Sequence, residues 1–91
     1  MQDINLACYV FTTKYVVKES SLVTTVLHEA DGDWQFLGHE QNLCIEDAML
    51  LSLKEILIID SSLRSILNLP LGKKAIRKDI KDNWKILDIL D

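Results

Sequence analysis

Residues 22–38 read LVTTVLHEADGDWQFLG, two runs rich in β-branched and aromatic residues on either side of Asp31-Gly32. An Asp-Gly pair between two such runs is typical of a β-hairpin, because both residues tolerate the positive φ angles of a two-residue type I′ turn. The sequence therefore predicts a hairpin with strands at residues 22–30 and 33–38.

A two-residue loop would also set the register of this hairpin, because it pairs Ala30 with Asp33 and fixes every pair further along the strands. In that register one face is mainly apolar and is expected to meet the core; it carries Val23, Leu27, Trp34 and Phe36. The other face is only half polar, so we expect it to be partly covered, and it would allow a homodimer; it carries Val26, His28, Gln35 and Leu37.

Two consecutive short helices are predicted in the middle of the chain. Ser52 and Glu55 have the spacing of a capping box, in which each side chain binds the backbone N–H of the other, and this predicts a helix over about 53–59. Asp60 is typical of a second N-cap, for a helix that ends before Pro70.

Strands are predicted on both sides of these helices. Residues 7–11 are compact, apolar and partly β-branched, whereas residues 12–21 are expected to form only a turn or connector. Residues 73–80 and 84–87 are expected to form two strands after the helices. Strands before and after a central helical pair indicate the α+β class, here one small domain over residues 1–91 with a mostly antiparallel sheet.

The composition bounds the function classes. The 91 residues are 48% hydrophobic and 26% charged, which suits one core and argues against disorder. The longest apolar run, residues 7–11, is too short to span a bilayer, and the N-terminus has no signal-peptide pattern. Two cysteines cannot build a disulfide framework. We therefore expect a cytoplasmic protein that does not bind membranes.

Charge is segregated along the chain within a net charge of −4. Residues 29–60 carry eight carboxylates and one lysine, whereas residues 61–81 carry six cations and one aspartate. The acidic total argues against a nucleic-acid partner. Two interpretations remain open: the two segments face each other or are simply solvated, or the acidic segment forms a face that meets a basic protein partner.

The residues that usually carry chemistry do not form a recognisable site. No serine stands in a G-x-S-x-G turn, and the three glycines are too scattered for a phosphate-binding loop. We therefore expect neither an enzyme, a metal nor a cofactor. Both cysteines have apolar neighbours and are expected in the core. Metal-ligand spacing is absent from the four candidates, which are Cys8, His28, His39 and Cys44.

Several short motifs carry a resemblance to a known family. They are HEADGDWQFL at 28–37, SLKEI at 52–56, DSSL at 60–63, LPLG at 69–72 and AIR at 75–77. In this order and spacing they resemble a family of small bacterial domains of unknown function, grouped with the immunity-protein-33-like proteins of polymorphic toxin systems. The resemblance covers about residues 8–86. The chain departs from it at Ser61, where the family often has proline.

The resemblance implies a cytoplasmic protein that neutralises a cognate toxin by occlusion, without chemistry of its own, or a relative with another binding role. Nuclease toxins are commonly basic, which suits an acidic partner. A regulatory or housekeeping domain without a toxin partner is the alternative, followed by a small-ligand-binding protein. Charge and expected exposure, and not the family, nominate the residues that would contact a partner: Asp31, Asp33, Glu40, Glu46 and Asp47.

Overall fold

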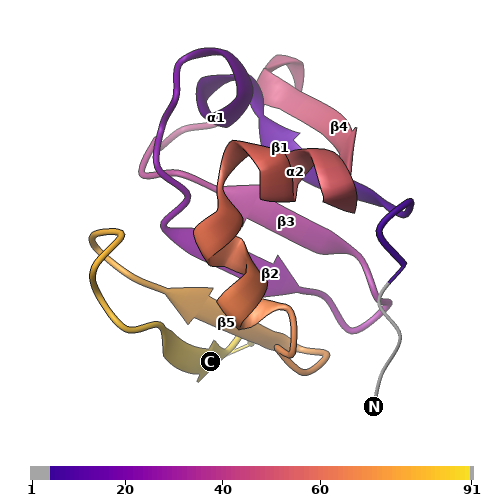
Figure 1. The fold of residues 1–91 in the computed structure, drawn as a ribbon, viewed down its shortest axis with the longest axis vertical. Helices are drawn as coiled ribbons and strands as arrows, with labels where there is room; N and C mark the ends of the chain where they lie inside the picture. Colours follow the sequence, from indigo (N-terminus) through magenta and orange to yellow (C-terminus); the bar gives the residue numbers. More distant parts are fainter. Residues whose placement is uncertain (1–4, 91) are drawn as a thin grey trace.

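A computed structural model of the protein describes residues 5–90. Six strands form a single sheet, and α1, α2 and η2 lie on one side of it (Figure 1). No helix within the described part of the chain has both the length and the apolar character needed to cross a bilayer. In chain order the elements are β1 (Tyr9–Thr13), α1 (Lys14–Lys18), β2 (Thr25–His28), β3 (Trp34–Leu37), η1 (Ile45–Asp47), β4 (Ala48–Ser52), α2 (Leu53–Ile59), η2 (Ser61–Ile66), β5 (Lys73–Ile76) and β6 (Lys85–Asp88).

The sheet has the strand order β4-β1-β3-β2-β5-β6. Neighbouring strands are antiparallel, with the exception of β1 and β3, which run parallel at the pair Phe11 and Gln35. The β2–β3 hairpin lies in the middle of the sheet, and α2 and η2 follow each other directly. The predicted α+β class with a mostly antiparallel sheet is therefore confirmed.

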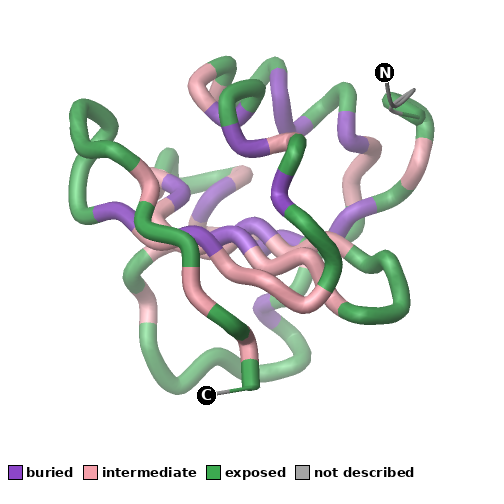
Figure 2. The backbone as a smooth tube through the Cα atoms, turned by 90° about the horizontal axis from the view of Figure 1, so that it is seen from below, coloured by how far each residue is buried: buried purple, intermediate pink, exposed green. Residues whose placement is uncertain are grey.

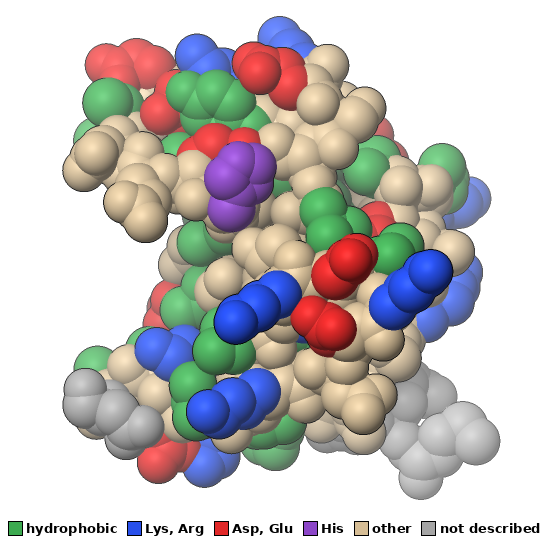
Figure 3. Space-filling view, turned by 90° about the vertical axis from the view of Figure 1, so that its left-hand side faces the viewer, with side chains coloured by type: hydrophobic (Ala, Val, Ile, Leu, Met, Phe, Trp, Pro, Cys, Tyr) green, Lys and Arg blue, Asp and Glu red, His purple; other side chains and the backbone are tan. Residues whose placement is uncertain are grey.

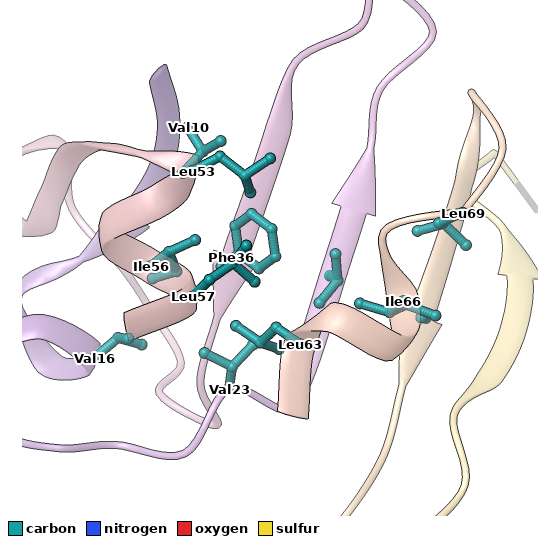
Figure 4. Close-up of a cluster of buried hydrophobic side chains, with 12 residues drawn as sticks. Val10, Val16, Val23, Phe36, Leu53, Ile56, Leu57, Leu63, Ile66 and Leu69 are labelled. Carbon is teal, nitrogen blue, oxygen red and sulfur yellow. The ribbon is translucent and has the colours of Figure 1, made fainter. Parts of the chain in front are cut away.

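The hydrophobic core lies between the sheet and the helices. Val10, Val26, Phe36 and Ala75 project from four different strands and are fully buried. From the helical side, side chains of α2 and η2 point towards Phe36, as Figure 4 shows. Each such side chain contributes about 1.5–3 kcal/mol when it is fully buried. Burial concentrates in the sheet and on its helical side, whereas the C-terminal end extends to the other side (Figure 2).

The predicted hairpin is present, but its predicted register is wrong by one residue. Glu29 N–H donates to Asp33 O at 2.8 Å and Gly32 N–H donates to Glu29 O at 2.9 Å, so the loop has three residues, 30–32, and not two. Gly32 supplies the positive φ, 98°, that closes such a loop.

This shift by one residue turns the side chains of β2 over, because successive residues of a strand point to opposite faces. Val26 pairs with Phe36 and His28 pairs with Trp34, so Val26 and His28 face the core and Leu27 faces away from it. The sequence had suggested the reverse for these three residues of β2. Trp34 and Phe36 lie on the core side, as expected.

The helix caps confirm the predictions made from spacing alone. Glu55 N–H donates to Ser52 Oγ at 3.1 Å and Ser52 N–H donates to Glu55 Oε1 at 2.9 Å, so α2 begins where the capping box places it. Asp60 caps the next helix by accepting from the N–H of Ser62 at 3.0 Å, although this helix is of the 3₁₀ type.

The segment 12–21 is not the simple connector that we expected. It contains the end of β1 and the short helix α1, which begins because Thr13 Oγ1 accepts from the N–H of Val16 and Val16 is buried. The apolar run 48–51, for which no element was predicted, forms β4, and this strand pairs with all of β1.

A candidate protein-binding surface

One face of the sheet is covered by none of the three helices α1, α2 and η2. In β1 and β4, Val10 and Leu51 point towards the helices, so their neighbours in sequence point to the opposite side. There Tyr9 is 69% exposed, Phe11 is 43% exposed and Leu50 is 53% exposed. We call this surface the open face; the pairing of the strands assigns to it Tyr9, Phe11, Leu27, Gln35, Leu37, Leu50, Lys74 and Leu87.

The open face is hollowed. Figure 3 views the sheet from one side, with the open face at the left, where the outline is indented between an upper and a lower part of the molecule. At one end of the face, Leu43 and Cys44 of the loop before β4 enclose a small cavity of about 180 Å³ together with Gln35 and Leu37. The hollow therefore has a floor of strand side chains and a wall formed by the 38–47 loop.

The two halves of the open face differ in polarity. The half on β4 and β1 is apolar, whereas β5 and β6 contribute Lys74 and Lys85. Between them, Gln35 Nε2 donates to Glu29 Oε1 at 2.8 Å, which joins the two side chains at the end of the hairpin. A partner that buries the apolar half thus meets the aromatic rings first and charged groups only at the margins.

The candidate contact residues of the hairpin tip are exposed, as expected. Asp31 Oδ1 accepts from the N–H of Asp33 at 3.0 Å, and both side chains belong to exposed residues. Glu46, in η1, is also exposed. The tip precedes β3, whereas Glu46 precedes β4, at the opposite end of the strands and two strands further along the sheet, so the two acidic sites are separate.

Asp47 is not the exposed contact residue that its charge suggested. The residue is only 8% exposed, its carboxylate accepts from the N–H of Cys44 at 2.9 Å, and it forms an ion pair with Lys14 at 3.2 Å. The backbone N–H of Cys44 lowers the pKa of Asp47, and Lys14 adds to this effect; the same contact with Asp47 raises the pKa of Lys14. Asp47 therefore holds the start of β4 and α1 together.

Glu40 is likewise turned into the fold. Its Oε2 accepts from Ser21 Oγ at 2.5 Å and lies 3.7 Å from His39 Nδ1. Its Oε1 is buried and has no hydrogen-bond partner among the described residues. Of the five nominated acidic residues, the structure thus leaves three on the surface, at two separate places: Asp31, Asp33 and Glu46.

The sequence interpretation missed the aromatic residues of the open face. β1 has the sequence YVFTT, in which Tyr9 and Phe11 alternate with Val10 and two threonines follow. Neither face of this strand carries a charge, so the sequence does not indicate which face meets solvent. Only the position of β1 between β3 and β4, with α1, α2 and η2 on the other side, exposes them. The alternation of aromatic residues at positions 9 and 11 was the one available signal.

The candidate metal ligands are dispersed. His28 stacks on Trp34 at 3.8 Å and its Nδ1 lies 2.6 Å from the carbonyl oxygen of Leu69, while His39 is exposed. Cys8 packs against the core as expected, but Cys44 is exposed and not buried, because it lies on the loop above the sheet. Across residues 5–90, no three His, Cys, Asp or Glu side chains converge in the manner of a metal site.

Comparisons of the chain with models of known families, with curated proteins and with solved structures find no match.

Proposed function

We propose that the protein is a non-catalytic binding module of the cytoplasm that acts as an immunity-type protein and neutralises a cognate toxin by covering it. One observation carries the proposal: Tyr9, Phe11 and Leu50 are exposed side by side on a sheet face without helices. Large aromatic side chains are enriched among the residues that dominate binding energy in protein interfaces.

The rigidity of this surface favours binding. Phe11 and Leu50 are directly paired across β1 and β4, and the residue beside Phe11, Val10, is fully buried in the core. Side chains held by such a frame lose little conformational freedom when a partner covers them, and the cost of association falls accordingly. Complete burial of one such side chain contributes about 1.5–3 kcal/mol.

The charges at the margins suit a basic partner. Glu46 lies beside the start of β4, and Asp31 and Asp33 lie at the hairpin tip, so exposed carboxylates stand at both ends of the strands. They would attract a basic protein during association, whereas the apolar floor would provide most of the affinity. A toxin domain with a basic surface and a projecting apolar segment would complement these acidic margins and the apolar floor between them.

The test is affinity capture with the tagged protein and with two variants. Phe11→Lys places a charge on the open face, and Ile86→Lys is the matched control, because Ile86 has a similar exposure, 46%, but lies on the edge strand β6 with its side chain on the helical side. We expect one basic protein that binds the unmodified chain and the Ile86 variant, elutes more readily at high salt, and is lost with Phe11→Lys.

The captured protein is then produced in cells together with each variant. The proposal predicts that it stops growth by itself, that the unmodified chain and Ile86→Lys restore growth, and that Phe11→Lys does not. Equal capture by all three chains would exclude the open face as the binding site. A captured protein that leaves growth unaffected would overturn the immunity function and favour a regulatory module.

A further inference from the structure

The two edges of the sheet are built differently. β4 has the sequence AMLLS, without a charge or a proline, and its five residues pair with β1 without interruption. β6, at the other edge, has the sequence KILD and carries a lysine and an aspartate. Edge strands of soluble proteins usually carry charges, prolines or bulges, because an unprotected edge invites a further strand. β4 lacks all three.

The backbone of Leu50 is directed towards the free edge. Leu53 N–H donates to Cys8 O at 2.8 Å, so residue 53 is a hydrogen-bonded position of the antiparallel pair β1–β4. Along an antiparallel strand, residues that bond to the neighbouring strand alternate with residues that do not. Residues 51 and 49 therefore bond to β1, whereas the N–H and C=O of Leu50 point away from β1. Leu50 is the middle residue of β4.

Apolar side chains border this edge on both sides of the sheet. On the helical side, Leu51, Ile58 and Ile59 line a shallow cavity of about 240 Å³, and Ile58 is 74% exposed. On the open face, Leu50 is half exposed. A strand that pairs with β4 would project its side chains alternately to these two sides and would cover both apolar surfaces.

We propose that β4 pairs with β4 of a second copy of this chain, antiparallel and about a two-fold axis at Leu50. The two Leu50 residues then exchange both N–H···O=C hydrogen bonds, and the six-stranded sheet continues into the second copy. A two-fold contact must be self-complementary. Met49 of one copy lies opposite Leu51 of the other on the helical side, and the two Leu50 side chains meet on the open face.

The charged residues near the ends of β4 favour a second copy of this chain, and not an unrelated strand, as the partner of β4. Antiparallel pairing centred on residue 50 places Glu46 of one copy and Lys54 of the other at the same end of the strand pair, because Glu46 lies two residues before β4 and Lys54 lies two residues after it. Both residues are exposed, and neither forms an ion pair within residues 5–90. The two-fold axis produces this pair twice, at the two ends of an otherwise uncharged strand.

The first measurement combines sedimentation equilibrium with amide hydrogen exchange over a range of protein concentrations. We expect a monomer–dimer equilibrium in which the Leu50 amide becomes protected as the dimer fills. A dimer that forms without protection of this amide would overturn the proposal, and so would a chain that stays monomeric at every concentration.

Charge reversal provides a second, independent readout. Glu46→Lys and Lys54→Glu alone each set like charges opposite each other, and each is expected to weaken the dimer about tenfold, since two contacts change at once. The double variant restores the pairs and should restore the dimer. Failure of this rescue, with both single variants folded, would contradict the register.

Two further variants separate this edge contact from packing of two open faces. Met49→Lys should abolish the dimer, because it places a charge opposite Leu51 of the second copy on the helical side of the new strand pair, away from the open face. Ile86→Lys on the other edge strand should leave the dimer intact. A dimer that survives Met49→Lys but is lost with Phe11→Lys would assign the contact to the open face and overturn the proposal. None of these measurements requires the toxin partner.

Discussion

Arg77 Nη2 lies 3.0 Å from Oδ2 of Asp60, and this ion pair joins the residue after β5 to the N-cap of η2. The same guanidinium donates to the carbonyl oxygen of Val23 and to Ser62 Oγ, each at 3.0 Å, and the ring of Trp84 stacks on it at 4.1 Å. One buried arginine thus connects the helical layer, the segment before β2 and the end of the sheet. It is also one place where the acidic and basic segments of the chain meet.

Loss of Arg77 is therefore expected to be severe. Arg77→Ala leaves Asp60 without its charged partner in a partly buried site and should reduce the free energy of unfolding by about 3–5 kcal/mol. Arg77→Lys should recover only part of the loss, because an ammonium group cannot reach all three acceptors in a planar arrangement. Urea denaturation measures both; Arg64→Ala, at an exposed position of η2, is the control and should change stability by less than about 0.5 kcal/mol.

Ser61→Pro is expected to stabilise the protein. Ser61 is the first residue of η2, where the N–H has no helical acceptor, and Asp60 already has the extended backbone that proline requires of the preceding residue. The unfolded chain loses freedom while the folded chain loses no contact, so we expect a gain of about 0.5–1 kcal/mol. Thermal and urea unfolding would detect it; a loss of stability would show that the N–H of Ser61 is needed.

Gly32→Ala tests the three-residue hairpin loop. No atom lies within 4 Å of the Cβ that alanine would add, so the cost comes only from the positive φ of 98° and should be about 1 kcal/mol. Gly32→Asn should cost less, because asparagine tolerates positive φ more readily. Equal unfolding free energies for glycine and alanine at this position would contradict the assigned loop.

The carboxyl groups of Asp47 and Glu55 should make stability depend on acidity. Hydrogen bonds from the backbone N–H groups of Cys44 and Ser52, respectively, lower the two pKa values in the folded protein. A carboxyl group whose pKa is lower in the folded protein than in the unfolded chain stabilises the fold. This stabilisation is complete above the pKa of the unfolded chain, near 4, and is lost as the pH falls through the pKa of the folded protein.

The difference in stability between the unmodified chain and Asp47→Asn should therefore be largest above about pH 5 and should narrow below pH 4. The same holds for Glu55→Gln. Denaturant unfolding from pH 7 to pH 2 measures this dependence directly. If the curves of variant and unmodified chain run parallel over that range, these two carboxyl groups do not carry the acid sensitivity.

The structural features that the sequence determined by itself are those formed by interactions between residues close together in the chain. The capping box of Ser52 and Glu55 and the cap at Asp60 join atoms no more than three residues apart, so spacing alone located both helices. The Asp31-Gly32 turn likewise located the hairpin.

The register of the hairpin, by contrast, was decided by tertiary structure. Two- and three-residue loops both accommodate Asp31-Gly32, and the packing of Val26 against Phe36 and Ala75 selects the longer one. The residues of the turn alone do not determine the loop length, because the loop length depends on packing against strands that are distant in sequence.

The same is true of the candidate binding surface. In the sequence, Asp47 and Glu40 have no visible partner. In the structure, Asp47 forms an ion pair with Lys14 and Glu40 accepts a hydrogen bond from Ser21, and both partners are distant along the chain. Phe11 and Val10 are equally apolar in the sequence, yet one is half exposed and the other is fully buried. Side-chain alternation divides β1 between two faces, and only the position of the helices decides which face meets solvent.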